Sequence, residues 1–201
     1  MRKLTLVILV FVFQLSIVEA QRLGIKGGLD ILGVNYSYNG ESKNSNPQMG
    51  FHLGMAMEFK LSNSFALASG VYFTEKGFQE DYHLPDKDKT TFFYMDVPAL
   101  LVYKIPTTNN NLYLHAGPYL GIGLFTNLTG SNFEIEEGFG NEPEQYRKYD
   151  LGLGLGGGIE YDNLRLGLAY SVGLFDIRNA TDTSVKNMVL GIDVAYMFGQ
   201  R

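Results

Sequence analysis

The sequence predicts an all-β protein, an eight-stranded antiparallel up-and-down transmembrane β-barrel, and three observations support this prediction. Apolar residues alternate with small or polar ones in eight segments, as in strands whose two faces meet different surroundings. Long and short connections alternate between these segments, which is typical of outer-membrane barrels. After residue 20, no apolar stretch reaches the roughly 20 residues that a membrane-spanning helix needs.

Residues 1–20 are predicted to be a cleaved signal peptide, so the barrel domain is expected over residues 21–201. Arg2 and Lys3 precede a nearly unbroken apolar run, and Ala20 ends the segment with a small residue where signal peptidase cuts. A permanent membrane helix is the alternative, but the run is too short to span. No cysteine follows the run, which excludes lipoprotein processing.

The first four predicted strands cover residues 22–32, 49–60, 64–78 and 92–104. The alternation is clearest in the second, where every other residue from Met49 to Phe59 is apolar and the residues between them are small, polar or charged. The fourth is less regular because Leu100 falls on the same face as Asp96. Pro98 in its middle predicts a bulge or a locally broken ladder.

The last four predicted strands cover residues 112–125, 148–161, 164–174 and 188–198. In the sixth strand, leucines on one face oppose glycines and charged residues, including Lys148, on the other. Each of the eight segments has at least 11 residues, enough for a tilted crossing of about 9 to 11 residues. The barrel must close, because an open edge would leave backbone groups unpaired in lipid.

The connections predict how the barrel is oriented. Long connections are expected at about 33–48, 79–91, 126–147 and 176–187, and short ones at 61–63, 105–111 and 162–163. Outer-membrane barrels have short periplasmic turns and longer extracellular loops, so both ends of the mature chain are expected in the periplasm. Aromatic residues near strand ends, among them Phe92 and Tyr94, are expected to form interfacial girdles where they face outward.

The inward face decides whether the barrel is plugged, conducting or ligand-binding, because eight strands enclose little more than their own side chains. Inward charges of both signs occur in similar number, Lys76 and Lys104 included, and charges in a narrow space must pair. The predicted interior polar network consists of Lys26, Asp30, His52, Glu58, Asp96, His115, Asp150, Glu160, Arg165 and Asp193. The residues predicted to face lipid are Phe51, Leu53, Met55, Leu151, Leu153, Leu155, Leu166, Leu168, Leu190 and Ile192.

Other motifs predict no cofactor, metal site or enzymatic activity. Gly152, Gly154 and Gly157 match a dinucleotide-binding pattern, but bulky residues alternate with them and no helix follows. The three histidines lack zinc-site spacing, and the acidic loops, such as the one with Glu142, are expected to be solvated. Ser171, His115 and Asp150 face inward, and nothing around them marks a nucleophile.

Composition limits the partners. The formal net charge is −5, which argues against nucleic acid or an anionic membrane surface. We expect a monomer that contacts outer-membrane lipid and envelope or secretion-system proteins through its long loops. Phe198 as the last outward aromatic residue resembles the signal read by the barrel-assembly machinery, although a strand that simply ends in Phe is the plainer explanation.

Several segments resemble the PorT-like small outer-membrane β-barrel proteins of Bacteroidetes over nearly the whole mature chain. The more specific pair is Tyr-Met-Asp-Val-Pro at 94–98 and Ala-Gly-Pro-Tyr-Leu-Gly at 116–121; weaker matches lie at 24–30, 50–54, 75–77 and 156–160. Gly70 departs from the family, which often has an inward acidic residue there. The resemblance implies fold and location, and for some members a link to protein secretion.

These inferences predict a non-enzymatic outer-membrane barrel with a polar, largely plugged interior and four extracellular loops for structural, adhesion or envelope-assembly contacts. One alternative is a narrow passive pore, because rows of inward glycines could leave voids. A second alternative is a secreted carrier of a small apolar ligand, similar to a lipocalin, which would need an apolar interior and a polar exterior.

Overall fold

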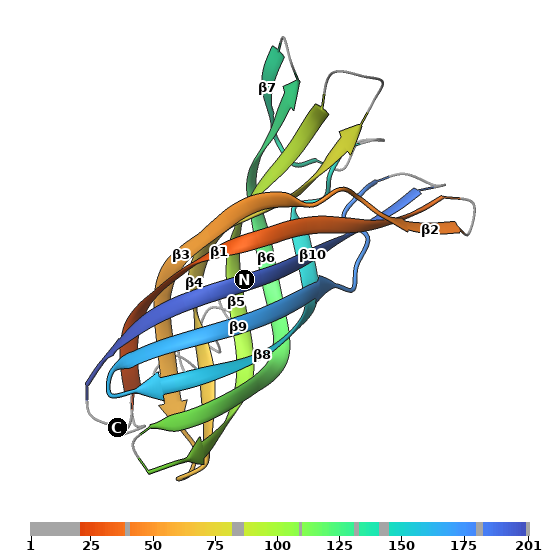
Figure 1. Ribbon diagram of the computed structural model, residues 1–201. Coiled ribbons are helices and arrows are strands. Elements are labelled where there is room, and N and C mark those ends of the chain that lie inside the picture. Colours follow the sequence, from red (N-terminus) through yellow and green to blue (C-terminus); the bar gives the residue numbers. More distant parts are fainter. Residues whose placement is uncertain are drawn as a thin grey trace, which may run out of the picture.

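A closed antiparallel barrel dominates the computed structural model (Figure 1), which describes residues 21–38, 41–81, 87–108, 110–130, 133–140, 145–179 and 183–199. Within these residues the chain forms ten strands in a single sheet. Eight of them form the wall in the order β1-β3-β4-β5-β6-β8-β9-β10, and the pairing of β10 with β1 closes it. The eight-stranded antiparallel barrel predicted from the sequence is confirmed.

The wall strands are longer than the alternation predicted. Their bounds are β1 Gln21–Tyr38, β3 Gln48–Lys60, β4 Phe65–Asp81, β5 Lys87–Pro106, β6 Asn111–Gly130, β8 Tyr149–Tyr161, β9 Leu164–Gly173 and β10 Thr183–Phe198. Two short strands complete the sheet, β2 (Glu41–Asn44) beside β1 and β7 (Phe133–Glu137) beside β6. The predicted signal peptide, residues 1–20, lies outside the described residues.

Three of the predicted long loops are largely strand-paired. The first contains the end of β1 and all of β2, the second is bounded by paired ends of β4 and β5, and the third contains the end of β6 and all of β7. The long connections lie where they were predicted, but their bounds were too wide, because these mostly polar segments lack the sustained alternation of a lipid-facing strand. Their backbones can still pair above the apolar surface, and Figure 1 shows these hairpins rising from one end of the barrel. We call this the long-hairpin end.

The opposite end carries the short turns, and we call it the short-turn end. In the β3–β4 turn, the Ser62 hydroxyl accepts a hydrogen bond from the Phe65 amide at 3.0 Å. The two-residue β8–β9 turn places Asp162 at a φ of 50°, as tight hairpins require. Gln21 pairs with Phe59 and Leu23 with Phe198, so the start of β1 and the end of β10 also lie here.

The irregularity predicted at Pro98 is present as a local break in pairing. Around this residue the ladders of β5 with β4 and with β6 are interrupted, because proline has no amide hydrogen to donate. The Ser69 hydroxyl donates to the Pro98 carbonyl at 2.7 Å and so satisfies one of the freed groups. The register shift lies a few residues away, between Phe93 and Tyr94.

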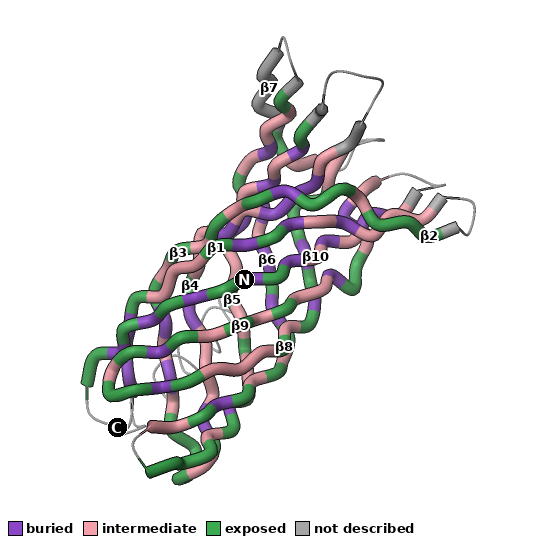
Figure 2. The backbone as a smooth tube through the Cα atoms, in the orientation of Figure 1, coloured by how far each residue is buried: buried purple, intermediate pink, exposed green. Residues whose placement is uncertain are grey.

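Buried and exposed residues alternate along the strands of the wall (Figure 2), and the two faces differ sharply in chemistry. The ten apolar residues predicted to face lipid are all exposed on the exterior, from 38% at Leu151 to 65% at Ile192. Charged residues such as Asp150 and Glu160 are fully buried inside. Among the described residues, no helix is long and apolar enough to cross a membrane.

Candidate functional site

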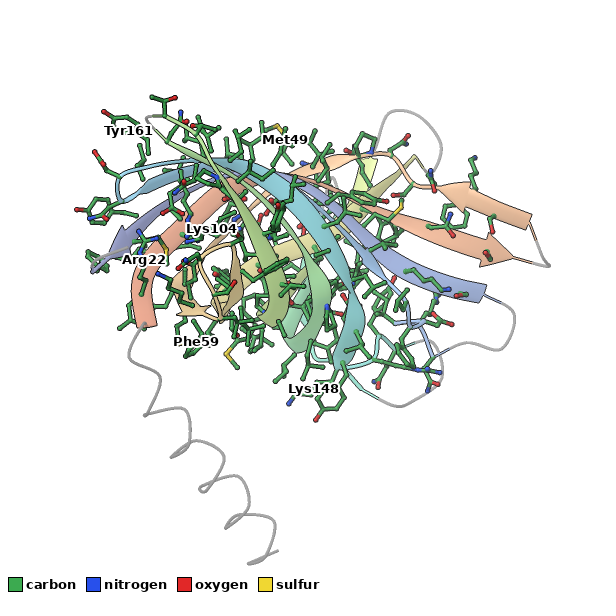
Figure 3. The ribbon with its side chains drawn as sticks, turned by 90° about the horizontal axis from the view of Figure 1, so that it is seen from below. Arg22, Met49, Phe59, Lys104, Lys148 and Tyr161 are labelled. Carbon is green, nitrogen blue, oxygen red and sulfur yellow. The ribbon has the colours of Figure 1, made fainter. Side chains whose placement is uncertain are left out.

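The interior of the barrel gathers its charged side chains into groups along its length. Near the short-turn end lie Arg22 and Lys104, whereas Lys148 points away from the barrel (Figure 3). From this end toward the long-hairpin end, the interior contains an ion cluster, a middle region with cavities, a second ion cluster and an aromatic layer.

The first group is built around two buried glutamates, and we call it the Glu58–Glu160 cluster. Arg165 Nη2 lies 2.6 Å from Glu58 Oε2 and 2.5 Å from Glu160 Oε2. Lys104 Nζ lies 2.6 Å from Glu58 Oε1, and Arg22 Nη1 lies 2.8 Å from Glu160 Oε1. The two carboxylates thus share three cations.

This cluster ties together strands that are far apart in the sequence. Its five side chains come from β1, β3, β5, β8 and β9, and the Arg22–Glu160 bond joins residues 138 positions apart. Both glutamates are at most 3% exposed. A buried charge is tolerated only with partners, so the cluster fixes the relative positions of five wall strands.

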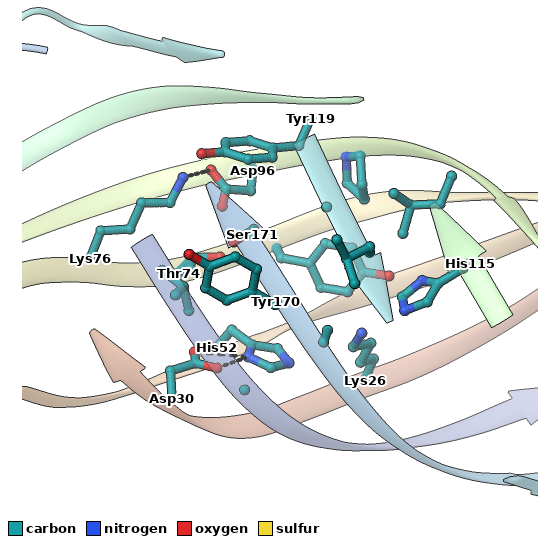
Figure 4. A pocket seen from close by; sticks show the side chains of 18 residues that line it. Lys26, Asp30, His52, Thr74, Lys76, Asp96, His115, Tyr119, Tyr170 and Ser171 are labelled. Atoms are coloured by element: carbon teal, nitrogen blue, oxygen red, sulfur yellow. Dashed lines mark hydrogen bonds and ion pairs between the residues drawn. The ribbon is translucent and has the colours of Figure 1, made fainter. Parts of the chain in front are cut away.

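Two separate polar pairs, one an ion pair and one a hydrogen bond, lie in the middle of the barrel. Lys26 Nζ is 3.1 Å from Asp193 Oδ2, and His52 Nδ1 is 2.9 Å from Asp30 Oδ2. His115 faces the same region, with its ring 6.0 Å from that of Tyr113 in an edge-to-face arrangement. Figure 4 shows the Asp30–His52 pair on one side of a cavity and the Lys76–Asp96 pair on another.

The second group, the Lys76 cluster, consists of Lys76, Asp96, Tyr119, Asp150 and Asn187. Lys76 is 1% exposed, and its Nζ lies 3.0 Å from Asp96 Oδ1 and 2.9 Å from Asp150 Oδ2. Asp150 Oδ2 also accepts hydrogen bonds from Tyr119 at 3.1 Å and Asn187 at 2.9 Å. The Lys76 ammonium lies 4.3 Å from the centre of the Tyr119 ring, within cation–π range.

An apolar layer covers the Lys76 cluster toward the long-hairpin end, and we call it the aromatic cap. Phe92 and Tyr94 are fully buried in it, and Phe139 packs against both at ring distances of 6.2 and 5.2 Å. Phe92 and Tyr94 face inward, so neither belongs to the interfacial girdle expected of the outward-facing aromatic residues. The run Phe92-Phe93-Tyr94 contains no polar residue to mark its inward face. The cap also contains Val34, Phe78, Ile177 and Val185, with Tyr36 and Tyr146 packed against it.

The inward glycines are covered by aromatic and imidazole rings. A Cβ atom at Gly152 would lie 2.5 Å from the Tyr119 ring, and one at Gly156 would lie 2.2 Å from His115 Nε2. At Gly70 a Cβ would meet the Tyr72 ring at 2.7 Å. Rings therefore fill much of the space that these glycines leave.

Cavities remain among the described side chains. One of about 130 Å³ lies between the Lys76 cluster and the middle polar pairs, and one of about 70 Å³ adjoins it through Lys26 and His115. A third, of about 120 Å³, lies beside the Glu58–Glu160 cluster. Each has room for several waters, and the first two lie between the two ion clusters.

The structure brings most of the predicted interior residues into contact. Glu58, Glu160 and Arg165 meet directly, and Asp96 and Asp150 meet through Lys76. Lys26 pairs with Asp193, and Asp30 pairs with His52. His115 lines two cavities.

Sequence reasoning left three participants out of the network and misplaced one residue. Arg22, Tyr119 and Asn187 were not assigned to it, whereas Lys76 was expected to face inward. Each omitted residue shares a face with a predicted interior residue, Arg22 with Lys26, Tyr119 with His115 and Asn187 with Asp193, so alternation could have found all three. Lys148 is exposed rather than inward, because the β8 ladder begins only at Tyr149.

The structure does not assemble the residues weighed as catalytic. Ser171 and His115 line the same cavity, but no hydrogen bond joins them within the described chain, and Asp150 is bonded to the Lys76 cluster. Among the described residues, no group of three or more His, Asp or Glu could hold a metal ion. His83 and Glu142 lie outside the described residues. The charged interior is also the reverse of what an apolar-ligand carrier requires.

Comparisons with known proteins give one family. Residues 19–179 match the family described as "Outer membrane protein beta-barrel domain". Among solved structures, Neisserial surface protein A is 18% identical with a TM-score of 0.47, covering 90% of this chain and 100% of its own. Ail, the attachment invasion locus protein of Yersinia pestis, is 15% identical with a TM-score of 0.43, covering 88% and 98%. No curated protein matches the sequence.

Proposed function

This chain belongs to the outer membrane protein beta-barrel domain family and lies in the outer membrane, and from that premise we propose that it is a non-enzymatic barrel with a closed interior. Its long hairpins, which we place outside the cell, make structural, adhesive or envelope-assembly contacts. The observation that carries this proposal is the interior itself, closed by the Glu58–Glu160 cluster toward one end and by the Lys76 cluster and aromatic cap toward the other.

The closed interior argues against a passive pore. An ion moving along the barrel would have to separate Lys76 from Asp96 and Asp150, and then pass the Glu58–Glu160 cluster. Breaking a buried ion pair costs several kcal/mol. Planar-bilayer recording of the purified protein tests this point: we expect no steady conductance steps, and reproducible steps would favour the pore instead.

The hairpins support the contact role. β2 and β7 extend their hairpins beyond the apolar exterior, and loops held by a rigid scaffold commonly carry binding function. The resemblance to PorT-like proteins favours a partner from the envelope or a secretion system. We also propose that the chain is a monomer inserted by the barrel-assembly machinery.

Crosslinking in intact cells tests the contact role, because the native chain offers no competing thiol. Gly138, beyond β7, is exposed and has no heavy atom within 4 Å of an added Cβ, so Gly138→Cys should fold normally. Thr108→Cys, in the exposed β5–β6 turn at the short-turn end, is the matched control. We expect a membrane-impermeant crosslinker to capture one discrete species through Gly138→Cys only. Capture of nothing, or of the same species by both variants, would contradict the proposal.

A further inference from the structure

Four cations lie around the border between the apolar exterior of the barrel and the long hairpins, and one of them, Arg178, is half-buried over the Tyr146 ring. They are Arg147, Lys148, Arg178 and Lys186, and we call them the basic rim. Arg147 and Lys148 directly precede β8, Arg178 follows β9, and Lys186 lies near the start of β10. In Figure 3 the Lys148 side chain points away from the barrel.

Backbone hydrogen bonds hold these segments side by side. The Arg147 amide donates to the Ile177 carbonyl at 2.6 Å, and the Ile177 amide donates to the Val185 carbonyl at 2.9 Å. Adjacent strands lie about 4.8 Å apart, so Arg147 and Val185 are separated by about 10 Å. Lys148 and Lys186 are their chain neighbours, and the rim is therefore one patch rather than scattered charges.

The lysines of the rim differ from the lysines inside the barrel. Lys26, Lys76 and Lys104 each lie within ion-pair distance of a carboxylate. Within the described chain, no carboxylate pairs with Lys148 or Lys186.

The acidic side chain inside the patch is already engaged. The Asp176 carboxylate accepts hydrogen bonds from the Arg178 amide at 2.9 Å and the Val185 amide at 2.8 Å. Arg147 donates to the backbone carbonyl of Asp176, at 3.4 Å, rather than to its carboxylate. Because the Asp176 carboxylate lies among three other cations, Arg147, Lys148 and Lys186, the described part of the rim keeps a local positive charge, although the whole chain has a formal net charge of −5.

Large apolar side chains lie next to these cations. Tyr149, Leu174 and Phe175 are 63%, 48% and 55% exposed, and the Leu174 amide donates to the Leu151 carbonyl at 2.9 Å within the wall. In a membrane, aromatic residues and cations concentrate at the boundary between acyl chains and headgroups. A molecule that fits this surface needs both a negative headgroup and an apolar body.

We propose that the basic rim binds the phosphorylated headgroup of a lipid in the leaflet at the long-hairpin end, with its acyl chains against Tyr149, Leu174 and Phe175. Lys and Arg are strong donors to phosphate oxygens, and clusters of them beside a membrane recognise anionic headgroups. The adjoining apolar side chains favour a lipid over a soluble anion. The inference depends on the membrane location and not on the contact role of the hairpins.

The test compares lipid enrichment around the full-length protein in phosphatidylcholine nanodiscs that contain a small fraction of diphosphoryl lipid A or of its dephosphorylated form. Lipid bound to the purified protein is quantified by mass spectrometry. The test variant is Lys148→Gln/Lys186→Gln, and the matched control is Lys43→Gln/Lys89→Gln, which removes two exposed lysines outside the rim. Mobility on unheated gels checks that each variant is folded.

We expect the wild type and the control to enrich the phosphorylated lipid over the dephosphorylated one. In the test variant this enrichment should be about tenfold lower. Raising the salt concentration should weaken the enrichment of the phosphorylated lipid. Equal enrichment of both lipids, equal loss in both variants, or no loss in the test variant would overturn the proposal. If millimolar inorganic phosphate displaced the phosphorylated lipid completely, the proposal that a lipid occupies the rim would be overturned.

Discussion

Replacing Lys76 by methionine is expected to destabilise the barrel strongly. Methionine keeps a similar length and apolar stem, but it leaves Asp96 and Asp150 buried without their shared cation. Removing one partner of a buried ion pair costs about 3 to 5 kcal/mol, and the variant also loses the contact with the Tyr119 ring. We therefore predict a loss of about 4 kcal/mol in the free energy of unfolding.

A triple variant separates charge from packing. Lys76→Met/Asp96→Asn/Asp150→Asn removes all three charges at similar volume, and neutral replacement of buried ion clusters is often tolerated. We expect the free energy of unfolding of the triple variant to lie within about 1 kcal/mol of the wild-type value, so that most of the loss is recovered. The control is Lys89→Met, at an exposed position, which should change the free energy of unfolding by less than about 0.5 kcal/mol.

The assay is urea unfolding in phospholipid vesicles followed by circular dichroism, since the chain contains no tryptophan. If Lys76→Met lowered the free energy of unfolding by less than about 1 kcal/mol, the expected cost of removing the shared cation would be refuted. A triple variant no more stable than the single one would show that packing, not charge, is decisive.

Three further predictions concern other parts of the barrel. Gly152→Val would place carbon 2.3 Å from the Val172 carbonyl oxygen and 2.5 Å from the Tyr119 ring; we expect little folded protein on unheated gels, and normal folding yield would contradict the close packing. Asp176→Ala removes the acceptor of two amides and should cost about 1 to 3 kcal/mol and speed hydrogen exchange at Val185, whose unchanged protection would count against this role. Glu58→Gln should destabilise more than Lys104→Met in the same urea assay, because Glu58 is 3% exposed and Lys104 19%; the reverse order would show that burial does not set the cost.

The wall of the barrel could be predicted because the sequence encodes its two faces residue by residue. Leu151, Leu153 and Leu155 alternate with Gly152 and Gly154, and the period of two fixes which side each occupies. The pattern fails where both faces share one chemistry. In Phe92-Phe93-Tyr94 all three residues are aromatic, and in the long hairpins most residues are polar.

The partners inside the barrel could be predicted less well, because contact depends on the stagger between neighbouring strands. Lys26 and Asp193 were both expected inside, but their contact follows from a register that pairs Lys26 with Ala195 and Gly28 with Asp193. Arg22 reaches Glu160 across the barrel, and no local pattern in the sequence encodes a contact of this kind.

Quenching by brominated lipids tests the orientation of the two faces most directly, because each variant would carry the chain's single tryptophan. Leu153→Trp and Ile192→Trp replace exterior residues, and Tyr113→Trp replaces a buried aromatic residue inside the barrel. We predict that bromine on the acyl chains strongly quenches the first two variants and leaves the third nearly unchanged. Strong quenching of Tyr113→Trp, or none of Leu153→Trp, would contradict an apolar exterior against lipid and a charged interior.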